Sequence, residues 1–440
     1  MGLRPALMLR MSLAFRASLV YRFNNGQRPN DARSANDGRR PNDVNNQQPI
    51  TNDETMFTPE LTAKLQNYST PFYYYDLALL RQTLAALKSA ASPHGYRVHY
   101  ALKANFDERL LGIIREHGLG ADCVSGNEVQ KALDCGFPAG EIVFAGVGKS
   151  DPEIRLGLEK GIRCFNCESL QELEVIDGLA GQAGRTAPVA LRINPDVDAH
   201  THQYITTGRE ENKFGIYYSE LAEMVAKVQQ FPHLKLEGIH FHIGSQITDI
   251  AVFQRLSRRV NEIQRWFRER EIALPLLNLG GGLGIDYQHP DARPVPDFAA
   301  YFNTFAEYLE LPAGQEVHFE LGRALVGQCG SLISRVLYIK QGRKTRFAIL
   351  DAGMTELIRP ALYQAHHQID NLTSRDEALT YDVVGPVCET ADFFAKGAML
   401  PQTRRGDLIA VRSAGAYGAV MASRYNLRPE VGVVYSDDVG

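Results

Sequence analysis

The chain has 440 residues, of which 44% are hydrophobic and 22% are charged, and its formal net charge is −4. This is the composition of an ordinary globular protein, long enough for two or three domains or for one large α/β barrel with an added domain. The nearly balanced charge gives no electrostatic case for nucleic-acid binding, and no apolar run approaches the roughly 18 residues of a membrane span. We therefore expect neither nucleic acid nor a membrane as a partner.

Residues 1–55 differ in composition from the rest of the chain. Residues 1–22 contain four arginines and no acidic residue, and residues 24–55 are rich in Asn, Asp, Pro and Arg. Such a segment cannot build a hydrophobic core, so we expect it to be disordered. Its arginine-rich start loosely resembles an organelle transit peptide. The alternative, which we favour, is an upstream extension with Met56 as the true start.

From about residue 77 the chain alternates between short apolar segments and amphipathic segments of helical period. The predicted strands are residues 98–103, 120–125, 141–146, 164–168, 189–194, 238–243, 276–281 and 317–322. The predicted helices are residues 107–117, 127–135, 151–160, 169–183, 219–230, 252–270 and 297–309. Successive βα units of this kind predict an α/β fold, a (β/α)8 (TIM) barrel over residues 77–323, with a doubly wound open sheet as the alternative.

The pattern changes after residue 323. Residues 324–340, 346–350, 381–384 and 407–412 have the pattern of strands separated by turns, and only short helical stretches interrupt them. We predict a mostly antiparallel C-terminal β domain over residues 324–440. Residues 71–75 are also strand-like, so we expect residues 56–76 to join that β domain.

Six scattered cysteines, at positions 123, 135, 164, 167, 329 and 388, are too few for a disulfide framework. They are typical of a reducing compartment, which predicts a cytoplasmic protein. Cys164 and Cys167 form a CxxC pair inside a predicted buried strand. There is no second CxxC and no nearby pair of histidines, so we predict no metal site.

Lys103 ends the first predicted strand. An ammonium buried without a partner is costly, so interior lysines usually have a chemical task, such as forming an imine with an aldehyde cofactor. The alternative is a lysine at a strand end that extends its amine to water. The residue alone does not distinguish the two.

Other unusual residues share that end of the predicted strands. They are Asp122 and Ser125 on the second strand, His242 and Ser245 on the sixth, Gly280, Gly281 and Gly282 on the seventh, and Glu320, Gly322 and Arg323 on the eighth. Barrel enzymes build their active sites at the carboxyl ends of the strands, and a random scatter would place half of these residues at the other end. Because all of these residues lie at the carboxyl ends of the predicted strands, we predict that the protein is an enzyme.

Each group also has a chemical interpretation and an ordinary one. The glycine run at residues 280–282 could bind a phosphate through its backbone N–H groups or simply form a flexible turn. Glu320 could keep a pyridine nitrogen protonated while Arg323 holds a phosphate or carboxylate, or the two could form a surface ion pair. His242 is either stacked on an aromatic ring, which we prefer, or a core histidine.

Together these residues resemble the fold-type III pyridoxal-phosphate decarboxylases, and within them the diaminopimelate decarboxylases. The resemblance covers approximately residues 70–435. The motifs that carry it are Tyr100-Ala101-Leu102-Lys103-Ala104-Asn105, Asp122-Cys123-Val124-Ser125-Gly126-Asn127-Glu128, His240-Phe241-His242-Ile243-Gly244-Ser245-Gln246, Gly280-Gly281-Gly282, Glu320-Leu321-Gly322-Arg323, Arg359-Pro360-Ala361-Leu362-Tyr363, Gly385-Pro386-Val387-Cys388-Glu389 and Gly415-Ala416-Tyr417-Gly418. One departure is Leu321, where the family more often has proline. We expect it to change the stiffness of a turn rather than the chemistry.

The resemblance implies a site for pyridoxal 5'-phosphate. Lys103 would carry this cofactor through an imine, with Asp122 and Tyr417 also in contact with it. His242 would stack on its ring, and Glu320 would pair with its pyridine nitrogen. Its phosphate would be bound by Ser245, Gly280, Gly281 and Gly282, and by the backbone near Gly322 and Arg323.

The resemblance also implies a substrate and a dimer. Arg323, Arg359 and Tyr363 would hold the distal carboxylate of meso-2,6-diaminopimelate, Glu389 its distal ammonium, and Tyr417 would touch it. In this family a head-to-tail homodimer completes the site, so Cys388 and Glu389 would come from the partner chain. Cys388 or a lysine would supply the proton that replaces carbon dioxide. The implied reaction gives L-lysine and carbon dioxide, by loss of the carboxylate at the D-centre, as the last step of lysine biosynthesis.

Four alternative functional assignments remain. A racemase of the alanine racemase type would place an arginine, rather than Glu320, at the pyridine nitrogen. An inactive homologue of the antizyme-inhibitor kind would have lost cofactor contacts such as Lys103. An ornithine or arginine decarboxylase would need only acidic groups at the far end, where Arg359 favours a second carboxylate. A carboxynorspermidine decarboxylase also needs a carboxylate partner, but its family lacks the Arg-Pro-Ala-Leu-Tyr and Cys-Glu-Thr pairing.

Overall fold

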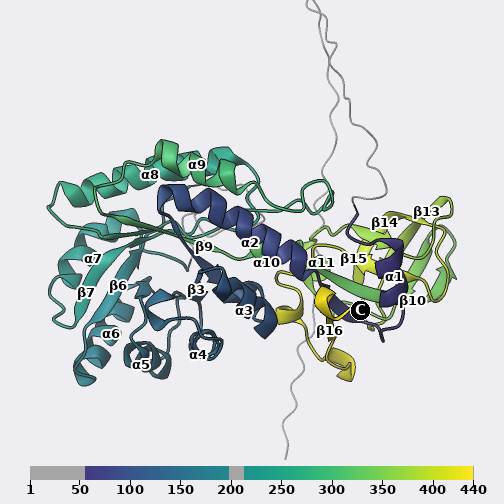
Figure 1. The fold of residues 1–440 in the computed structure, drawn as a ribbon. Coiled ribbons are helices and arrows are strands. Elements are labelled where there is room, and N and C mark those ends of the chain that lie inside the picture. Colours follow the sequence, from purple (N-terminus) through teal and green to yellow (C-terminus); the bar gives the residue numbers. More distant parts are fainter. Residues whose placement is uncertain (1–54, 198–212, 440) are drawn as a thin grey trace, which may run out of the picture. The chain divides into compact units, whose positions relative to one another are not determined.

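Eight parallel strands close into a barrel, in chain order, in the computed structural model, which describes residues 55–197 and 213–439 (Figure 1). They are β2 (Arg97–Ala101), β3 (Gly120–Cys123), β4 (Ile142–Phe144), β5 (Cys164–Cys167), β6 (Ala187–Arg192), β7 (Leu234–His240), β8 (Leu276–Asn278) and β9 (Glu316–Leu321). The predicted barrel is therefore confirmed, and the open sheet is wrong. The predicted N-terminal extension lies outside the described residues, apart from residue 55.

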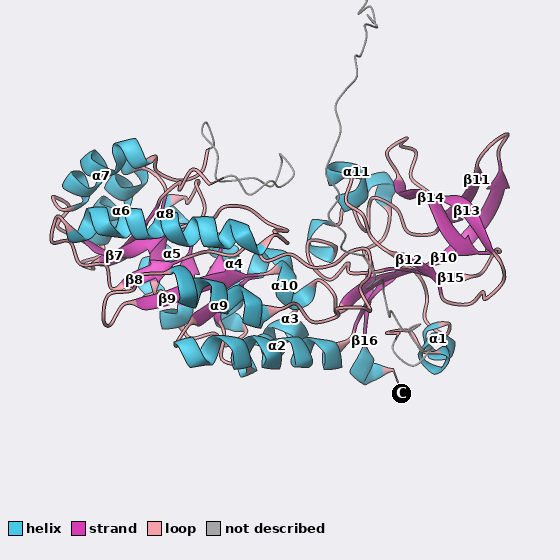
Figure 2. Cartoon of the chain, turned by 90° about the horizontal axis from the view of Figure 1, so that it is seen from above, coloured by secondary structure: helices cyan, strands magenta, loops and turns pink. Residues whose placement is uncertain are grey.

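Helices alternate with the barrel strands along the chain and surround them (Figure 2). They are α2 (Leu77–Ala91), α3 (Glu108–Glu116), α4 (Gly126–Asp134), α5 (Asp151–Lys160), α6 (Leu170–Gln182), α7 (Leu221–Val228), α8 (Ile250–Arg268) and α9 (Phe298–Tyr308). Side-chain caps fix where they begin: Ser125 accepts a hydrogen bond from Glu128 N at the start of α4, and Ser169 accepts one from Glu172 N at the start of α6. Such a cap is worth about 1 kcal/mol and keeps the loops after β3 and β5 short.

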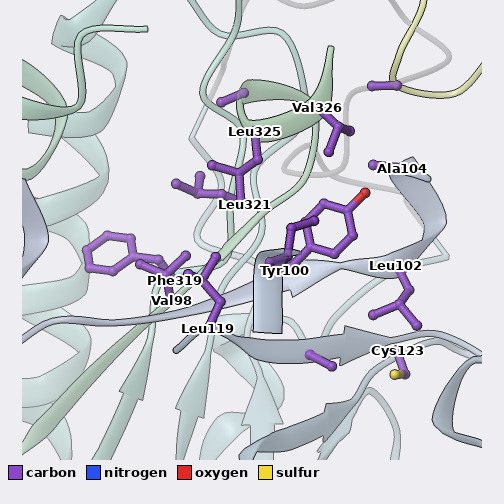
Figure 3. Close-up of a cluster of buried hydrophobic side chains, with 14 of the residues drawn as sticks. Val98, Tyr100, Leu102, Ala104, Leu119, Cys123, Phe319, Leu321, Leu325 and Val326 are labelled. Carbon is purple, nitrogen blue, oxygen red and sulfur yellow. The ribbon is translucent and has the colours of Figure 1, made fainter. Parts of the chain in front are cut away.

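Outward-facing apolar side chains of β2 and β9 form part of the core beneath the helices. Val98, Tyr100, Phe319 and Leu321 belong to this cluster (Figure 3). Phe319 is fully buried, and its ring centroid lies 5.0 Å from that of Phe302 on α9. Burial of each such ring contributes roughly 1.5–3 kcal/mol. This packing holds two neighbouring barrel strands in register.

The alternate residues of the same strands face the barrel interior and are polar, because successive side chains of a strand point to opposite sides. His99, His318 and Glu320 are all nearly inaccessible to solvent. His99 lies opposite Glu320 across the pairing of β2 and β9, and its Nε2 is 2.8 Å from His318 Nδ1. The barrel therefore has a polar interior beneath its carboxyl end.

A second sheet is built mainly from the residues after the barrel. Its strands are β10 (Gly330–Gln341), β11 (Arg346–Leu350), β12 (Ile369–Asn371), β13 (Ala378–Val384), β14 (Phe393–Pro401), β15 (Leu408–Val411) and β16 (Gly432–Tyr435). The strand β1 (Phe72–Tyr75) follows α1 (Pro59–Leu65) and precedes the barrel, yet it pairs antiparallel with β10 and parallel with β16. The pairing of β11 with β13 is also parallel and the rest are antiparallel, which confirms a mostly antiparallel sheet.

The start of this second sheet differs from the prediction. The sequence predicts one strand over residues 324–340, but Arg323–Val326 forms the short helix α10, and β10 begins only at Gly330. A short apolar run such as Ala-Leu-Val is compatible with either a helix or a strand, so its hydrophobicity could not decide. Three strands, β12, β14 and β16, were not predicted. In β14, Lys396 and Gly397 interrupt the apolar alternation that marks a strand.

Candidate active site

Lys103 lies in a single helical turn (Leu102–Ala104) directly after β2. Its neighbours Leu102 and Ala104 are fully buried and anchor the turn, while the lysine side chain is 37% exposed and lines a cavity of about 910 Å³. Its Nζ lies 3.2 Å from Asp122 Oδ2. Burial alone would lower the pKa of Lys103, but Asp122 and two further groups nearby raise it above its usual value. The amine is therefore protonated here and must lose a proton before it can react with an aldehyde.

Asp122 is the partner to which Lys103 can give that proton. It lies on β3, is fully buried, and its Oδ1 has no hydrogen-bond partner among the described residues. Burial and the Glu320 carboxylate raise the pKa of Asp122 to about 6, while Lys103 opposes the shift. A carboxyl group with this pKa can exchange protons near neutral pH.

Glu320 lies on β9 and is held by three donors inside the barrel. His240 Nε2 is 2.9 Å from Oε2, and the side-chain amides of Asn166 and Asn278 donate to Oε1 at 3.1 and 2.7 Å. Burial alone would raise the pKa of Glu320, but His240 and Lys103 lower it below its usual value. A carboxylate has about four acceptor positions, so three donors leave room for one more. That position would be available to a further donor, such as the protonated ring nitrogen that the sequence predicts.

The glycine run at residues 280–282 follows β8, and side chains are excluded from it. A Cβ on Gly280 would lie 2.2 Å from Phe241 O, and a Cβ on Gly281 would lie 2.0 Å from Glu320 O. Gly280 also has a φ of +65°, which glycine adopts without strain. The two residues that follow the run line the cavity. Only glycine allows the backbone to pass this close to β7 and β9, beside the cavity.

His242 and Ser245 follow β7 and line the same cavity as Lys103. His242 Nδ1 accepts a hydrogen bond from Gly281 N at 3.4 Å, and burial together with Arg192 lowers the pKa of His242 well below its usual value. The imidazole is therefore neutral, and its face is suited to packing against an aromatic ring. Ser245 supplies a hydroxyl to the same wall.

Two buried arginines reach the cavity without an acidic partner. Arg323 and Arg359 are 6% and 5% exposed, and neither forms an ion pair with a residue that the structure describes. Arg323 donates to Tyr287 Oη at 2.5 Å and to Ser245 Oγ at 3.0 Å, and Arg359 donates to His367 Nε2 at 2.9 Å. Burial and Arg359 lower the pKa of His367 to about 3, so all three acceptors are neutral. Buried charges without a counter-charge are costly, so this pair predicts an anionic ligand group.

Tyr363 and Tyr417 complete this side of the cavity. Tyr363 ends the short helix α11 (Arg359–Tyr363). Tyr417 has a φ of +55°, which is strained for a bulky residue, and its N–H donates to Ala104 O at 2.8 Å. Such strain persists where surrounding contacts impose it, often at functional sites. The contact fixes Tyr417 against the turn that carries Lys103.

Cys388 and Glu389 are not part of this cavity. Both are exposed in the loop between β13 and β14, and Glu389 accepts a hydrogen bond from Tyr425 Oη at 2.8 Å. The structure therefore brings together the sequence-predicted residues of the barrel and of α11, but leaves these two apart from them in the single chain.

Five residues that hold the site in place were not predicted from the sequence. Tyr287 and His367 contact the two arginines, and His240, Asn166 and Asn278 surround Glu320. One signal was available: His240 precedes His242 by two residues, the spacing that places side chains on one face of a strand.

Comparison with known proteins assigns the family. The pyridoxal-binding domain of the pyridoxal-dependent decarboxylases matches residues 77–327. A diaminopimelate decarboxylase of Bacteroides thetaiotaomicron is 57% identical over 366 residues, which cover 83% of this chain and 95% of that relative. The chain belongs to the diaminopimelate decarboxylase family. This membership implies pyridoxal phosphate as the cofactor.

Further diaminopimelate decarboxylases agree in sequence and in fold. The Zymomonas mobilis enzyme is 41% identical over 379 residues, covering 86% of this chain and 89% of its own. The crystal structure of the Helicobacter pylori enzyme complexed with L-lysine is 39% identical, with a TM-score of 0.80 over 85% of this chain and 93% of that one. No helix among the described residues has the length and apolar character needed to span a membrane.

Proposed function

We propose that this protein removes carbon dioxide from meso-2,6-diaminopimelate to give L-lysine, with pyridoxal 5'-phosphate attached at Lys103. The observation that carries the proposal is the pair of buried arginines, Arg323 and Arg359, which reach the same cavity as Lys103 and, among the residues that the structure describes, have only neutral hydrogen-bond partners. A substrate with a second carboxylate would supply the missing negative charge.

The residues around Lys103 fit the cofactor. Glu320 has one acceptor position left for a ring nitrogen, and His242 presents a neutral imidazole face to the cavity. We assign the phosphate to Ser245 and to the backbone of residues 280–282 and 322–323. When bound, the cofactor's protonated ring withdraws electrons from the substrate carbon that loses carbon dioxide.

The protein's own groups control the protons. Asp122, with its pKa raised to about 6, takes a proton from Lys103 so that the amine can act as a nucleophile. Glu320 stays ionised because His240 and Lys103 lower its pKa, and it would therefore keep the cofactor's ring nitrogen protonated. We propose that the final proton comes from Cys388 of a second chain or from a lysine.

Substrate choice depends on the far end of the cavity. Arg323, Arg359 and Tyr363 would hold the distal carboxylate, with Tyr417 beside both substrate and cofactor. Glu389 lies outside the Lys103 cavity of its own chain, and we propose that it binds the distal ammonium in the cavity of the partner in a head-to-tail homodimer. We further propose that the enzyme works in the cytoplasm, since all six cysteines are unpaired.

The test is carbon dioxide release by the purified protein with pyridoxal phosphate, using meso-diaminopimelate, L-ornithine and L-arginine in parallel. Release from meso-diaminopimelate alone, with L-lysine as product, is the expected result. Release from ornithine or arginine would keep the cofactor site and overturn the assignment of the two arginines. A Lys103→Ala chain assayed alongside gives the background.

A further inference from the structure

Arg323 and Arg359 converge on one residue that the proposed reaction does not yet use. Tyr287 lies in the long loop between β8 and α9, and it lines the cavity. Its Oη accepts a hydrogen bond from Arg323 Nη1 at 2.5 Å, and its ring centroid lies 4.8 Å from Arg359 Cζ. A single neutral side chain therefore contacts both guanidinium groups, one through its oxygen and the other through its ring face.

The two guanidinium groups need such a contact because they repel each other in a buried setting. Burial, with the charge of Arg323 adding to it, lowers the pKa of Arg359, and Tyr287 opposes that shift. A carboxylate in place of Tyr287 would neutralise the pair and remove its attraction for an anion. A neutral oxygen and an aromatic face stabilise the two cations without satisfying their charge, which leaves them available to a ligand.

Tyr287 is itself held from several sides. Its ring packs edge-on against His367, with ring centroids 5.0 Å apart, and its carbonyl oxygen accepts a hydrogen bond from Gln368 N at 3.1 Å. Four residues later, Asp291 pairs with the buried Arg412 at 2.5 Å. These contacts join the loop to residues next to β12 and to the end of β15, so the position of Tyr287 is fixed by the second sheet and does not depend on a bound substrate.

We propose that Tyr287 is a positioning residue that determines specificity, because it sets Arg323 and Arg359 at the spacing that accepts the distal carboxylate of the substrate. The inference rests on the proposed function and deepens it. L-lysine keeps that carboxylate after the reaction, whereas cadaverine is the same chain without it. Their difference in affinity therefore isolates the carboxylate contact from the contacts to the amines.

The test is titration calorimetry of L-lysine and of cadaverine with the holoenzyme of the wild type and of Tyr287→Phe, which keeps the ring and removes the oxygen. Because the variant loses the oxygen that holds Arg323 by a charge-assisted hydrogen bond, Arg323 is no longer fixed for the carboxylate, and L-lysine should bind roughly tenfold or more weakly. Cadaverine should bind within about twofold of its wild-type affinity. Tyr435→Phe is the matched control: it removes a hydroxyl that donates to Asp107 Oδ2 at 2.6 Å, outside the cavity, and should change neither ligand.

Two results would overturn the assignment. If Tyr287→Phe leaves L-lysine binding unchanged, the two arginines do not depend on the phenol. If L-lysine and cadaverine weaken equally, Tyr287 supports the cavity as a whole rather than the carboxylate. Melting temperature and cofactor absorbance of each variant show whether it has folded and loaded. The proposed function fails separately, if the wild type releases no carbon dioxide from meso-diaminopimelate.

Discussion

Replacing Glu320 by Gln removes the negative charge opposite the proposed ring nitrogen while keeping the size of the side chain. In the wild type, donors from Asn278, Asn166 and His240 reach the two carboxylate oxygens at 2.7, 3.1 and 2.9 Å. Each charge-assisted bond is worth about 1 kcal/mol more than its neutral counterpart, so about 3 kcal/mol of gross stabilisation is lost. The lower cost of burying a neutral amide offsets most of this. We therefore expect a small change in stability.

The effect on catalysis should be much larger. An amide cannot hold a proton on a ring nitrogen as an anion does, and loss of an electrostatic group of this kind typically costs about 10²–10³-fold in kcat. That is about 3–4 kcal/mol of activation free energy. The assay is steady-state carbon dioxide release from meso-diaminopimelate, with cofactor content measured by absorbance and stability by urea unfolding.

A matched control separates charge from packing. Asp351 lies outside the cavity and also accepts three hydrogen bonds, from Thr70 Oγ1, Ser334 Oγ and Arg335 N. Asp351→Asn should alter stability and leave kcat unchanged. If Glu320→Gln, fully loaded with cofactor, keeps kcat within about threefold of the wild type, the role given to Glu320 is wrong.

Three further predictions concern the amine, the distal ammonium and acid stability. Lys103→Ala should lose the visible absorbance of a lysine-bound cofactor, and retention of that band would remove Lys103 from its role. Glu389→Gln should raise KM about tenfold through loss of a charge-assisted contact, and an unchanged KM would place the ammonium elsewhere. Burial and His99 lower the pKa of His318 to about 2 from 6.5, so the unfolded state binds more protons below pH 6.5 and stability falls as the pH drops from 6.5 towards 2. At 1.36 kcal/mol per pH unit, His318→Gln should lose about 2 kcal/mol less than the wild type between pH 7.5 and pH 5 in urea unfolding, and an equal loss in the two proteins would contradict the lowered pKa of His318.

The barrel was predictable from the sequence because its signals are local. Eight apolar segments, the first seven of them each followed by an amphipathic helix, admit few arrangements, and all eight appear as strands of one barrel. The start of the second sheet was not predictable in the same way. Ala324, Leu325 and Val326 are apolar and buried, as they would be in either a helix or a strand, so the hydrophobic pattern does not decide between the two.

The positions of the barrel residues proposed for the site were predictable for the same reason. Lys103, His242 and Glu320 stand at strand ends, where the topology alone brings them together. Tyr287 has no such signal: it lies in an irregular loop, and its contacts with Arg323 and Arg359 depend on how that loop meets the second sheet. The roles given to the site residues stay predictions until the variants are measured.

The pairing of β1 has a consequence for how the chain can be divided. This strand lies between β10 and β16, so the second sheet takes an interior strand from before the barrel and an edge strand from the end of the chain. A fragment that starts after the barrel therefore lacks a central strand, and a chain truncated before residue 432 leaves one side of β1 unpaired. The second sheet can therefore be completed only after β16 has been synthesised, well after the barrel strands. Because α11 and Tyr417 also follow the barrel in the chain, the barrel alone does not provide all the walls of the cavity around Lys103.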